Sequence, residues 1–292
     1  MVRFDFKVFC VNFSAYIMSF FIVSTPIGNL GDLSTRAIDV LSSSNIIICE
    51  KKNKALKLIS HLKINKVKII SYHESKLKKI FPEIIKSLKE SKKISFISDA
   101  GTPLISDPGS LLIKKLIINN IEPIVVPGPS ASLSALIVSG FNTDKFIFHG
   151  FLPKSASKLK KEVDNVISSN IPVIFYANKN DLYKIFSILK TENKEIYFSL
   201  SKELTKKFEG TIRGKISEVD ISEIKSFSSK GEFVLILLKV AKDKDLNIEK
   251  IKKRIKELME KSLTRKEISE KIRDEFELKK NESYKLTLKF HD

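Results

Sequence analysis

Short apolar runs alternate with amphipathic stretches along the first half of the chain. The apolar runs predict strands at 20–24, 45–49, 67–71, 94–98 and 123–126. The amphipathic stretches predict helices at 35–43, 53–61, 76–90, 109–119 and 131–139. Strand–helix alternation is typical of a mostly parallel sheet with helices on both faces. The pattern therefore predicts an N-terminal α/β domain over residues 18–142.

A second α/β domain is expected over residues 143–242. Residues 141–155 interrupt the alternation and are interpreted as a crossover into this domain. The pattern then predicts helices at 157–168 and 180–190, and strands at 172–176, 195–200, 207–212 and 232–240. The last of these strands, EFVLILLKV, is almost continuously apolar, which is typical of a strand buried on both faces. A polar link follows Ala241, and residues 243–292 are predicted to form a small basic helical module.

The N-terminus allows two interpretations. Residues 8–23 are mostly apolar and follow Arg3 and Lys7, as in a signal peptide. Cleavage near Ser24 would destroy the first predicted strand, and the run is too short and too polar for a convincing membrane span. We therefore expect Met18 to be the natural start and residues 1–17 to be an N-terminal extension. A cytoplasmic protein without a membrane partner is expected.

Charge and composition narrow the possible classes of protein. The chain of 292 residues has a net charge of +18, with two cysteines and four histidines. This supply of thiols and imidazoles excludes a disulfide scaffold and argues against a zinc enzyme, so no metal site is predicted. Residues 50–93 hold 14 Lys against four Glu. Such density favours a polyanionic partner, but charge alone leaves ribonucleic acid and ordinary solvated helices equally open.

Three loops rich in glycine and proline follow three of the predicted strands. They are Ser24–Leu30, Ser98–Gly109 and Val126–Ala131. Ligands of open α/β sheets bind beyond the carboxyl ends of the strands, so the loops are expected to form one wall of a crevice. Within the second loop, Asp107 and Pro108 are interpreted as a helix N-cap and first turn. Nucleotide P-loop, dinucleotide-fingerprint and zinc-protease motifs are absent from the sequence.

These loops resemble those of the tetrapyrrole-methylase superfamily. The long segment SDAGTPLISDPG, starting at Ser98, carries most of the resemblance, together with STPIGNL at Ser24 and VPGPSA at Val126. Shorter matches occur at Gly150–Pro153, Lys202–Lys206 and Lys230–Leu235. Within the superfamily, the chain is most similar to the branch that methylates small-subunit ribosomal RNA.

The resemblance implies a fold of two α/β domains with S-adenosylmethionine bound in the cleft between them, usually in a homodimer. The implied reaction is 2′-O-methylation of a cytidine ribose in small-subunit ribosomal RNA, either free or in the small ribosomal subunit. The residues that would contact the donor are Pro26, Asp99, Ala100, Gly101, Thr102, Ser130, Ala131, Leu200, Ser201, Lys202 and Gly231. Candidate RNA contacts are Arg36, Lys51, Lys52, Lys54, Lys76, Lys78 and Lys79.

A 2′-hydroxyl is a weak nucleophile, so a general base within hydrogen-bond reach would help the reaction. The candidates are His73, Glu74 and Glu203. The favoured interpretation of His73 is instead a loop residue with a structural hydrogen bond, and that of Glu203 is the partner of a neighbouring lysine.

The acceptor side departs from the branch pattern. Glu50-Lys51-Lys52-Asn53 stands where the branch has Glu-Asp-Thr-Arg, and Ala177–Asp181 also differs. An ammonium group cannot reproduce the two-pronged hydrogen bonding of a guanidinium. Two alternatives therefore stay open, a methylase of a tetrapyrrole carbon and a catalytically inactive RNA-binding assembly factor.

Overall fold

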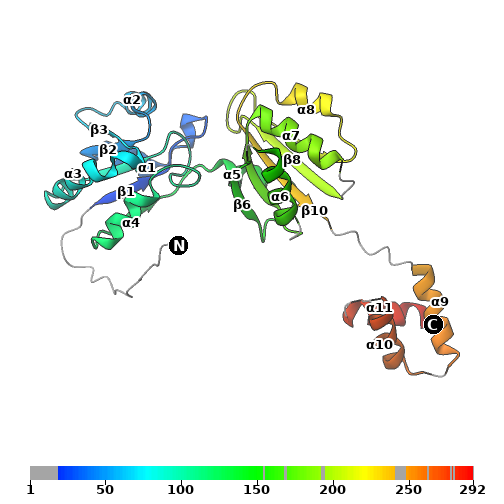
Figure 1. Ribbon diagram of the computed structural model, residues 1–292. Helices are drawn as coiled ribbons and strands as arrows, with labels where there is room; N and C mark the ends of the chain where they lie inside the picture. The colour runs from blue at the N-terminus through cyan, green and yellow to red at the C-terminus, as the bar shows by residue number, and fades with distance from the viewer. Residues whose placement is uncertain are drawn as a thin grey trace. The chain divides into compact units, whose positions relative to one another are not determined.

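The computed structural model describes residues 19–153, 155–167, 170–191, 195–240, 248–261, 263–276, 278 and 280–291. The chain divides into two compact units, Met1–Leu238 and Lys239–Asp292 (Figure 1). The expected extension over 1–17, the expected start at Met18 and the polar link after Ala241 lie outside the described residues.

Five parallel strands form the first sheet, in the order β3-β2-β4-β1-β5. They are β1 (Phe20–Val23), β2 (Ile46–Cys49), β3 (Lys68–Ser71), β4 (Ile94–Ile97) and β5 (Ile124–Val126). The helices of this half are α1 (Thr35–Ser42), α2 (Lys52–His61), α3 (Leu77–Lys89), α4 (Ser110–Ile118) and α5 (Ala131–Ile137). Each strand and helix predicted for this half is present, with ends shifted by a few residues at most.

Helices cover both faces of this sheet because its strands are apolar on both sides. Ile46 and Ile48 pack in one core cluster with residues of α3 and α4. Ile47 and Cys49 pack in another, with residues of α1 and α2. Successive strand side chains point to opposite faces, so a run of four buried residues supplies both clusters. The expectation of a doubly covered parallel sheet is confirmed.

The start of α4 corrects one detail of the sequence interpretation. The helix begins at Ser110 and its N-cap is Gly109, with φ of +129°. Asp107 therefore lies in the loop before the helix and does not cap it. A carbon on Gly109 would lie 2.7 Å from both Leu104 Cδ2 and a ring atom of Phe96, which explains glycine at this turn.

The second sheet is mixed, in the order β6-β7-β10-β8-β9. Its strands are β6 (Ile147–Phe151), β7 (Val173–Ala177), β8 (Ile196–Lys202), β9 (Gly210–Lys215) and β10 (Phe233–Lys239). Its helices are α6 (Ala156–Ile167), α7 (Lys179–Lys190) and α8 (Ile221–Phe227). Strand β6 pairs parallel to β7, whereas β10 pairs antiparallel to β7 and β9 pairs antiparallel to β8.

Two expectations for this half are wrong, and one helix was not predicted. The crossover at 141–155 contains the edge strand β6, the strand expected at 207–212 occupies 210–215, and α8 was not expected. Strand β6 is only half-buried and bulges between Phe148 and Gly150, so its apolar pattern is weak. The apolar strand β10 is central and buried as expected, with all of Phe233–Leu237 buried.

Helix α5 joins the two sheets. Its Ala135 and Leu136 share a core cluster with Ile174 of β7 and with Val234 and Ile236 of β10. At the end of the helix, the Arg213 Nε on β9 donates to the carbonyls of Val138 and Ser139, at 3.0 and 3.1 Å. These contacts attach a helix from the first alternation to the second sheet.

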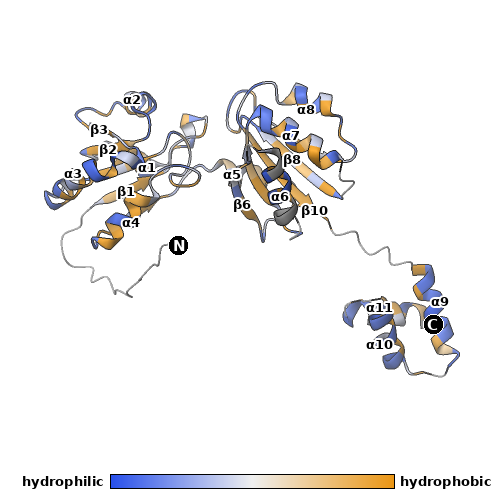
Figure 2. Cartoon of the chain, in the orientation of Figure 1, coloured by the Kyte–Doolittle hydropathy of each residue, from blue (hydrophilic) through white to orange (hydrophobic). Residues whose placement is uncertain are grey.

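The second unit is a bundle of three helices, α9 (Ile248–Met259), α10 (Arg265–Phe276) and α11 (Lys280–His291). Its core contains Ile251, Ile255, Leu258, Ile268 and Ile272. Polar residues dominate these helices, in contrast to the strands of the two sheets (Figure 2). The expected helical module is thus present. Among the described helices, none combines the length and the apolar character that crossing a membrane requires.

Candidate functional site

Backbone hydrogen bonds join the three loops that follow β1, β4 and β5. Thr25 N donates to Gly101 O at 2.9 Å, and Gly101 N donates to Thr25 O at 3.0 Å. Thr102 Oγ1 donates to Pro129 O at 3.1 Å and accepts from Ser24 Oγ at 3.3 Å. The loops therefore form a single wall beyond the carboxyl ends of the strands, as the sequence predicts.

Gly28 brings this wall against the turn that follows β8. A carbon added to Gly28 would lie 2.3 Å from Lys206 Cγ, 2.8 Å from Thr205 Oγ1 and 3.2 Å from Leu204 O. A residue with a side chain could not approach the turn so closely. The first loop and the turn at 203–206 are thus in direct contact.

A cavity of about 320 Å³ lies between this wall and one edge of the second sheet. This volume is within the range of small-molecule sites. Strand β7 ends where the antiparallel strand β10 begins, with Phe233 opposite Ala177, so both contribute to the same edge. The lining residues are Ile27, Ala100, Gly101, Thr102, Ile105, Ser106, Asp107, Ser130, Ala131, Phe151, Tyr176, Ala177, Asn178, Glu203, Leu204, Lys206, Gly231, Glu232, Phe233 and Val234.

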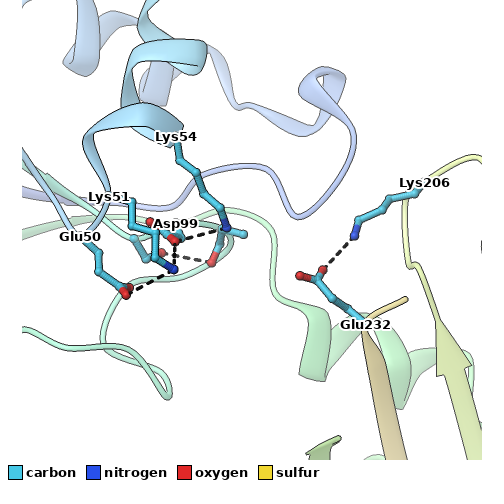
Figure 3. Close-up of polar contacts among 8 residues, drawn as sticks. Glu50, Lys51, Lys54, Asp99, Lys206 and Glu232 are labelled. Atoms are coloured by element: carbon cyan, nitrogen blue, oxygen red, sulfur yellow. Dashed lines mark hydrogen bonds and ion pairs between the residues drawn. The ribbon is translucent and has the colours of Figure 1, made fainter. Parts of the chain in front are cut away.

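Lys206 connects two carboxylates at the cavity. Its Nζ lies 3.1 Å from Glu203 Oε1 and 2.8 Å from Glu232 Oε2, and the second contact is drawn in Figure 3. Burial lowers the pKa of Lys206, but the hydrogen bonds that its ammonium group donates to Glu232 and Glu203, together with their charges, outweigh this effect and raise the pKa. The Glu232 backbone N–H donates to Glu203 Oε1 at 2.9 Å and, with Lys206, lowers the pKa of Glu203. A carboxylate so stabilised is a poor proton acceptor.

Asp107 contrasts with this carboxylate. It lines the cavity, and burial raises its pKa to about 6. The nearby negative charges of Glu50 and Asp99 also raise the pKa of Asp107. A hydrogen bond from Ser98 and the positive charge of Lys54 lower it, but by less. Across the cavity, burial raises the pKa of Tyr176, with a smaller contribution from Asp107.

A second charged cluster lies at the ends of β2 and β4 (Figure 3). Asp99 Oδ2 lies 3.0 Å from Lys51 Nζ and 3.2 Å from Lys54 Nζ. Lys51 Nζ also lies 3.7 Å from Glu50 Oε1. The Asp99 carboxylate raises the pKa of Lys51 through its hydrogen bond and its charge. Asp99 is only 12% exposed, so the two ammonium groups provide the compensation that a buried carboxylate requires.

Comparison with known proteins identifies the family. Residues 19–220 match the Tetrapyrrole (Corrin/Porphyrin) Methylases. The chain belongs to this family. Two solved structures share the fold: a cobalt precorrin-4 methyltransferase (TM-score 0.55, 12% identity) and the methyltransferase CobJ (0.56, 13%). Each match covers 75% of this chain, and 94% and 93% of the respective structures.

Curated relatives are more similar in sequence. A protein of Thermotoga maritima is 37% identical over 222 residues, covering 74% of this chain and 96% of that protein. A protein of Synechocystis is 32% identical over 271 residues, covering 92% of this chain and 96% of its own length. A Buchnera aphidicola protein is 37% identical over 238 residues, covering 79% of this chain and 82% of its own. All three are named ribosomal RNA small subunit methyltransferase I.

The structure brings together part of the predicted donor site of this methylase fold. Ala100, Gly101, Thr102, Ser130, Ala131 and Gly231 line the cavity. The remaining candidates, Pro26, Asp99, Leu200, Ser201 and Lys202, are not among its lining residues. Leu200 and Ser201 are buried within the sheet, and Lys202 Nζ donates to Phe227 O at 3.1 Å.

Two of the three predicted bases lie outside the cavity lining. His73 precedes a short 3-10 helix (Glu74–Lys76), and its Nδ1 accepts from Ser75 N at 3.3 Å. Glu74 Oε1 accepts from Gly109 N, at the start of α4, at 3.4 Å. These contacts match the structural interpretation of His73. Glu203 does line the cavity, and it is paired with a lysine as the alternative expected.

The predicted RNA contacts fall into two groups. The side chains of Lys51 and Lys54 are exposed, but their ammonium groups form ion pairs with Asp99. Arg36, Lys52, Lys76, Lys78 and Lys79 are exposed, and make no ion pair within the described part of the chain. Sequence reasoning missed several lining residues of the second half, including Tyr176, Asn178, Lys206 and Glu232. The motifs KELTK (residues 202–206) and KGEFVL (residues 230–235) did identify the segments that contain Lys206 and Glu232.

Proposed function

We propose that this protein transfers a methyl group from S-adenosylmethionine to the 2′-oxygen of a cytidine ribose in small-subunit ribosomal RNA. The observation that carries the proposal is the cavity, whose walls come from the loops most similar to the family. The names of the relatives supply the substrate class. The cytidine and its 2′-oxygen come from the resemblance of the sequence to the branch.

The cavity residues fit the donor. Ile27, Leu204 and Val234 offer apolar surface for a flat base, and the carboxylates of Glu203 and Glu232 suit a donor that carries positive charge. We assign donor contacts to Ala100, Gly101, Thr102, Ser130, Ala131 and Gly231. When bound, S-adenosylmethionine supplies a methyl group on a positively charged sulfur. A side chain at Gly101 would begin 3.1 Å from Ile27 Cγ2 and would obstruct the site.

Methyl transfer of this kind is an in-line displacement, so the main task of the protein is alignment. The hydrogen bonds between the loops fix one wall before the ligand arrives, and the Lys206 network fixes the opposite turn. Rigid walls reduce the entropy lost on binding. Water must also be excluded from the reacting atoms, and the apolar surface of Ile105 and Phe151 at the cavity serves this purpose.

Exposed lysines on α2 and α3 are the proposed RNA contacts, and they would bind phosphates without reading bases. We propose further that the protein acts in the cytoplasm and as a homodimer. Support for a second copy comes from apolar side chains exposed on α4, β5 and α5, namely Leu111, Ile117, Ile118, Val125, Leu133 and Ile137. Sedimentation of the full chain would separate a dimer from a monomer.

The decisive experiment is methyl transfer from labelled S-adenosylmethionine to purified small ribosomal subunits. Label in the ribose of one cytidine, absent with Gly101→Arg, is the expected result. Circular dichroism would show that the variant is folded, and calorimetry that it has lost donor binding. Donor binding by the wild type without label in RNA would instead favour an inactive assembly factor or another acceptor, such as a tetrapyrrole carbon.

A further inference from the structure

The Asp107 side chain does not cap helix α4 and forms no ion pair with any described residue, and the loop that carries it has an unusual backbone. Leu104 and Ser106 precede it with φ of +74° and +67°, a region that residues with side chains rarely adopt. Strain of this kind persists where the surrounding structure enforces it, and it concentrates at functional sites. Ser106 Oγ would lie 3.1 Å from a carbon added to Gly150 of β6, so the loop packs closely on the second sheet.

The groups that face Asp107 come from every element around it. Glu50 follows β2, Lys54 lies on α2, Ser98 and Asp99 follow β4, and Tyr176 lies on β7. Lys54 is already paired with Asp99 at 3.2 Å. Asp107 itself makes no ion pair with any described residue. It is therefore a carboxylate of the cavity that retains proton affinity, whereas Glu203 and Glu232 are paired with Lys206.

We propose that Asp107 is the general base that accepts the proton of the ribose hydroxyl during methyl transfer. This inference rests on the proposed function. The hydroxyl oxygen forms a bond to the methyl carbon as the carbon–sulfur bond breaks, and the sulfur keeps the electron pair of that bond. The hydroxyl proton passes to the Asp107 carboxylate and then to water. The products are the methyl ether and an uncharged thioether.

The burial of Asp107 suits this role. General bases work best when their pKa lies near the working pH, and an ordinary surface aspartate is too weak a base. Burial brings the pKa of Asp107 to about 6, so the group is ionised at neutral pH yet binds a proton readily.

The test compares wild type, Asp107→Asn and Asp107→Glu in single-turnover methyl transfer across pH 5–8. We expect the wild-type rate to rise with pH up to about 6 and then level. Asp107→Asn should be slower by about 100-fold or more and lose this dependence, while binding donor as wild type does by calorimetry. Asp107→Glu should regain part of the rate. Glu122→Gln, an exposed carboxylate outside the cavity lining, is the matched control with unchanged rate.

A second readout needs no activity. Because the folded pKa of Asp107 is above the unfolded value of 3.8, its contribution to stability is complete below 3.8 and lost as pH rises through about 6. The unfolding constant of wild type should therefore rise relative to Asp107→Asn by roughly three- to tenfold between pH 5 and 8. A residue needed only for structure would destabilise the fold when replaced.

The outcomes separate the two proposals. No methyl transfer by the wild-type protein would contradict the proposed function. Equal rates for wild type and Asp107→Asn would overturn the assignment of Asp107 alone, as would a variant that keeps the pH dependence.

Discussion

Gly28 offers a quantitative test of the contact between the two halves of the cavity. In Gly28→Ala, the new carbon would lie 2.3 Å from Lys206 Cγ and 2.8 Å from Thr205 Oγ1. Lys206 can move only by weakening its bonds to Glu203 and Glu232. The carbonyl oxygen of Leu204, 3.2 Å from the new carbon, belongs to the backbone, and the Leu204 side chain is buried, so this residue cannot move by itself. The turn must therefore shift as a whole.

The expected cost follows from these contacts. Inserting a carbon into a packed site typically costs about 1–3 kcal/mol. The ion pairs of Lys206 are partly exposed, so their weakening adds only a few tenths of a kcal/mol. We expect the free energy of unfolding of Gly28→Ala to fall by roughly 1–3 kcal/mol. Donor affinity should fall as well, because the displaced turn lines the cavity.

Equilibrium unfolding in urea measures the first effect and calorimetric donor titration the second. The matched control is Gly31→Ala, in the short 3-10 helix (Leu30–Asp32) at the end of this loop, where the nearest atom to the new carbon is Asn29 Oδ1 at 3.2 Å. That variant should stay within about 0.5 kcal/mol of wild type. Equal stability and donor affinity in Gly28→Ala and Gly31→Ala would refute the claim that Gly28 permits this close approach.

Other consequences of the structure are open to measurement. Lys78→Glu combined with Lys79→Glu should weaken RNA binding and flatten its salt dependence, by a slope of about 0.7–0.9 per lost phosphate contact; an unchanged slope in filter binding would argue against these lysines. Arg213→Met should lower the free energy of unfolding in urea by about 0.5–1.5 kcal/mol, because the exposed Val138 carbonyl at the end of α5 loses its donor. Ile255→Ala, at a fully buried position of the second unit, should lower the free energy of unfolding of that unit by about 2–5 kcal/mol while leaving donor binding intact.

Local patterns were sufficient for the parallel half of the fold. Apolar runs such as Ile46–Cys49, separated by amphipathic stretches, specify strands and helices through side-chain periodicity alone. The elements of the second half were harder to predict because their apolar patterns are weaker. The edge strand β6 is half-buried and bulged, and α8 has seven residues, so neither produces a clear period.

The residues of the candidate site were likewise easier to predict in the first half than in the second. Glycine and proline in the three loops have local conformational causes, and the loops do meet as expected. The family motif around Asp99 was readable from consecutive residues. The candidates Leu200, Ser201 and Lys202 are not among the lining residues of the cavity. Alternate residues of a strand face opposite sides, and the motif does not say which side faces the cavity.

Residues close together in the sequence therefore specify the strands and helices of the first half, the three loops and the family to which they belong. These depend on neighbours within a few residues. The tertiary structure was needed to see that Asp99 pairs with Lys51 and Lys54, that Lys206 binds two carboxylates, and that Asp107 lies in the cavity with no ion pair to any described residue. Such pairings join segments far apart in the chain, so patterns among neighbouring residues do not reveal them.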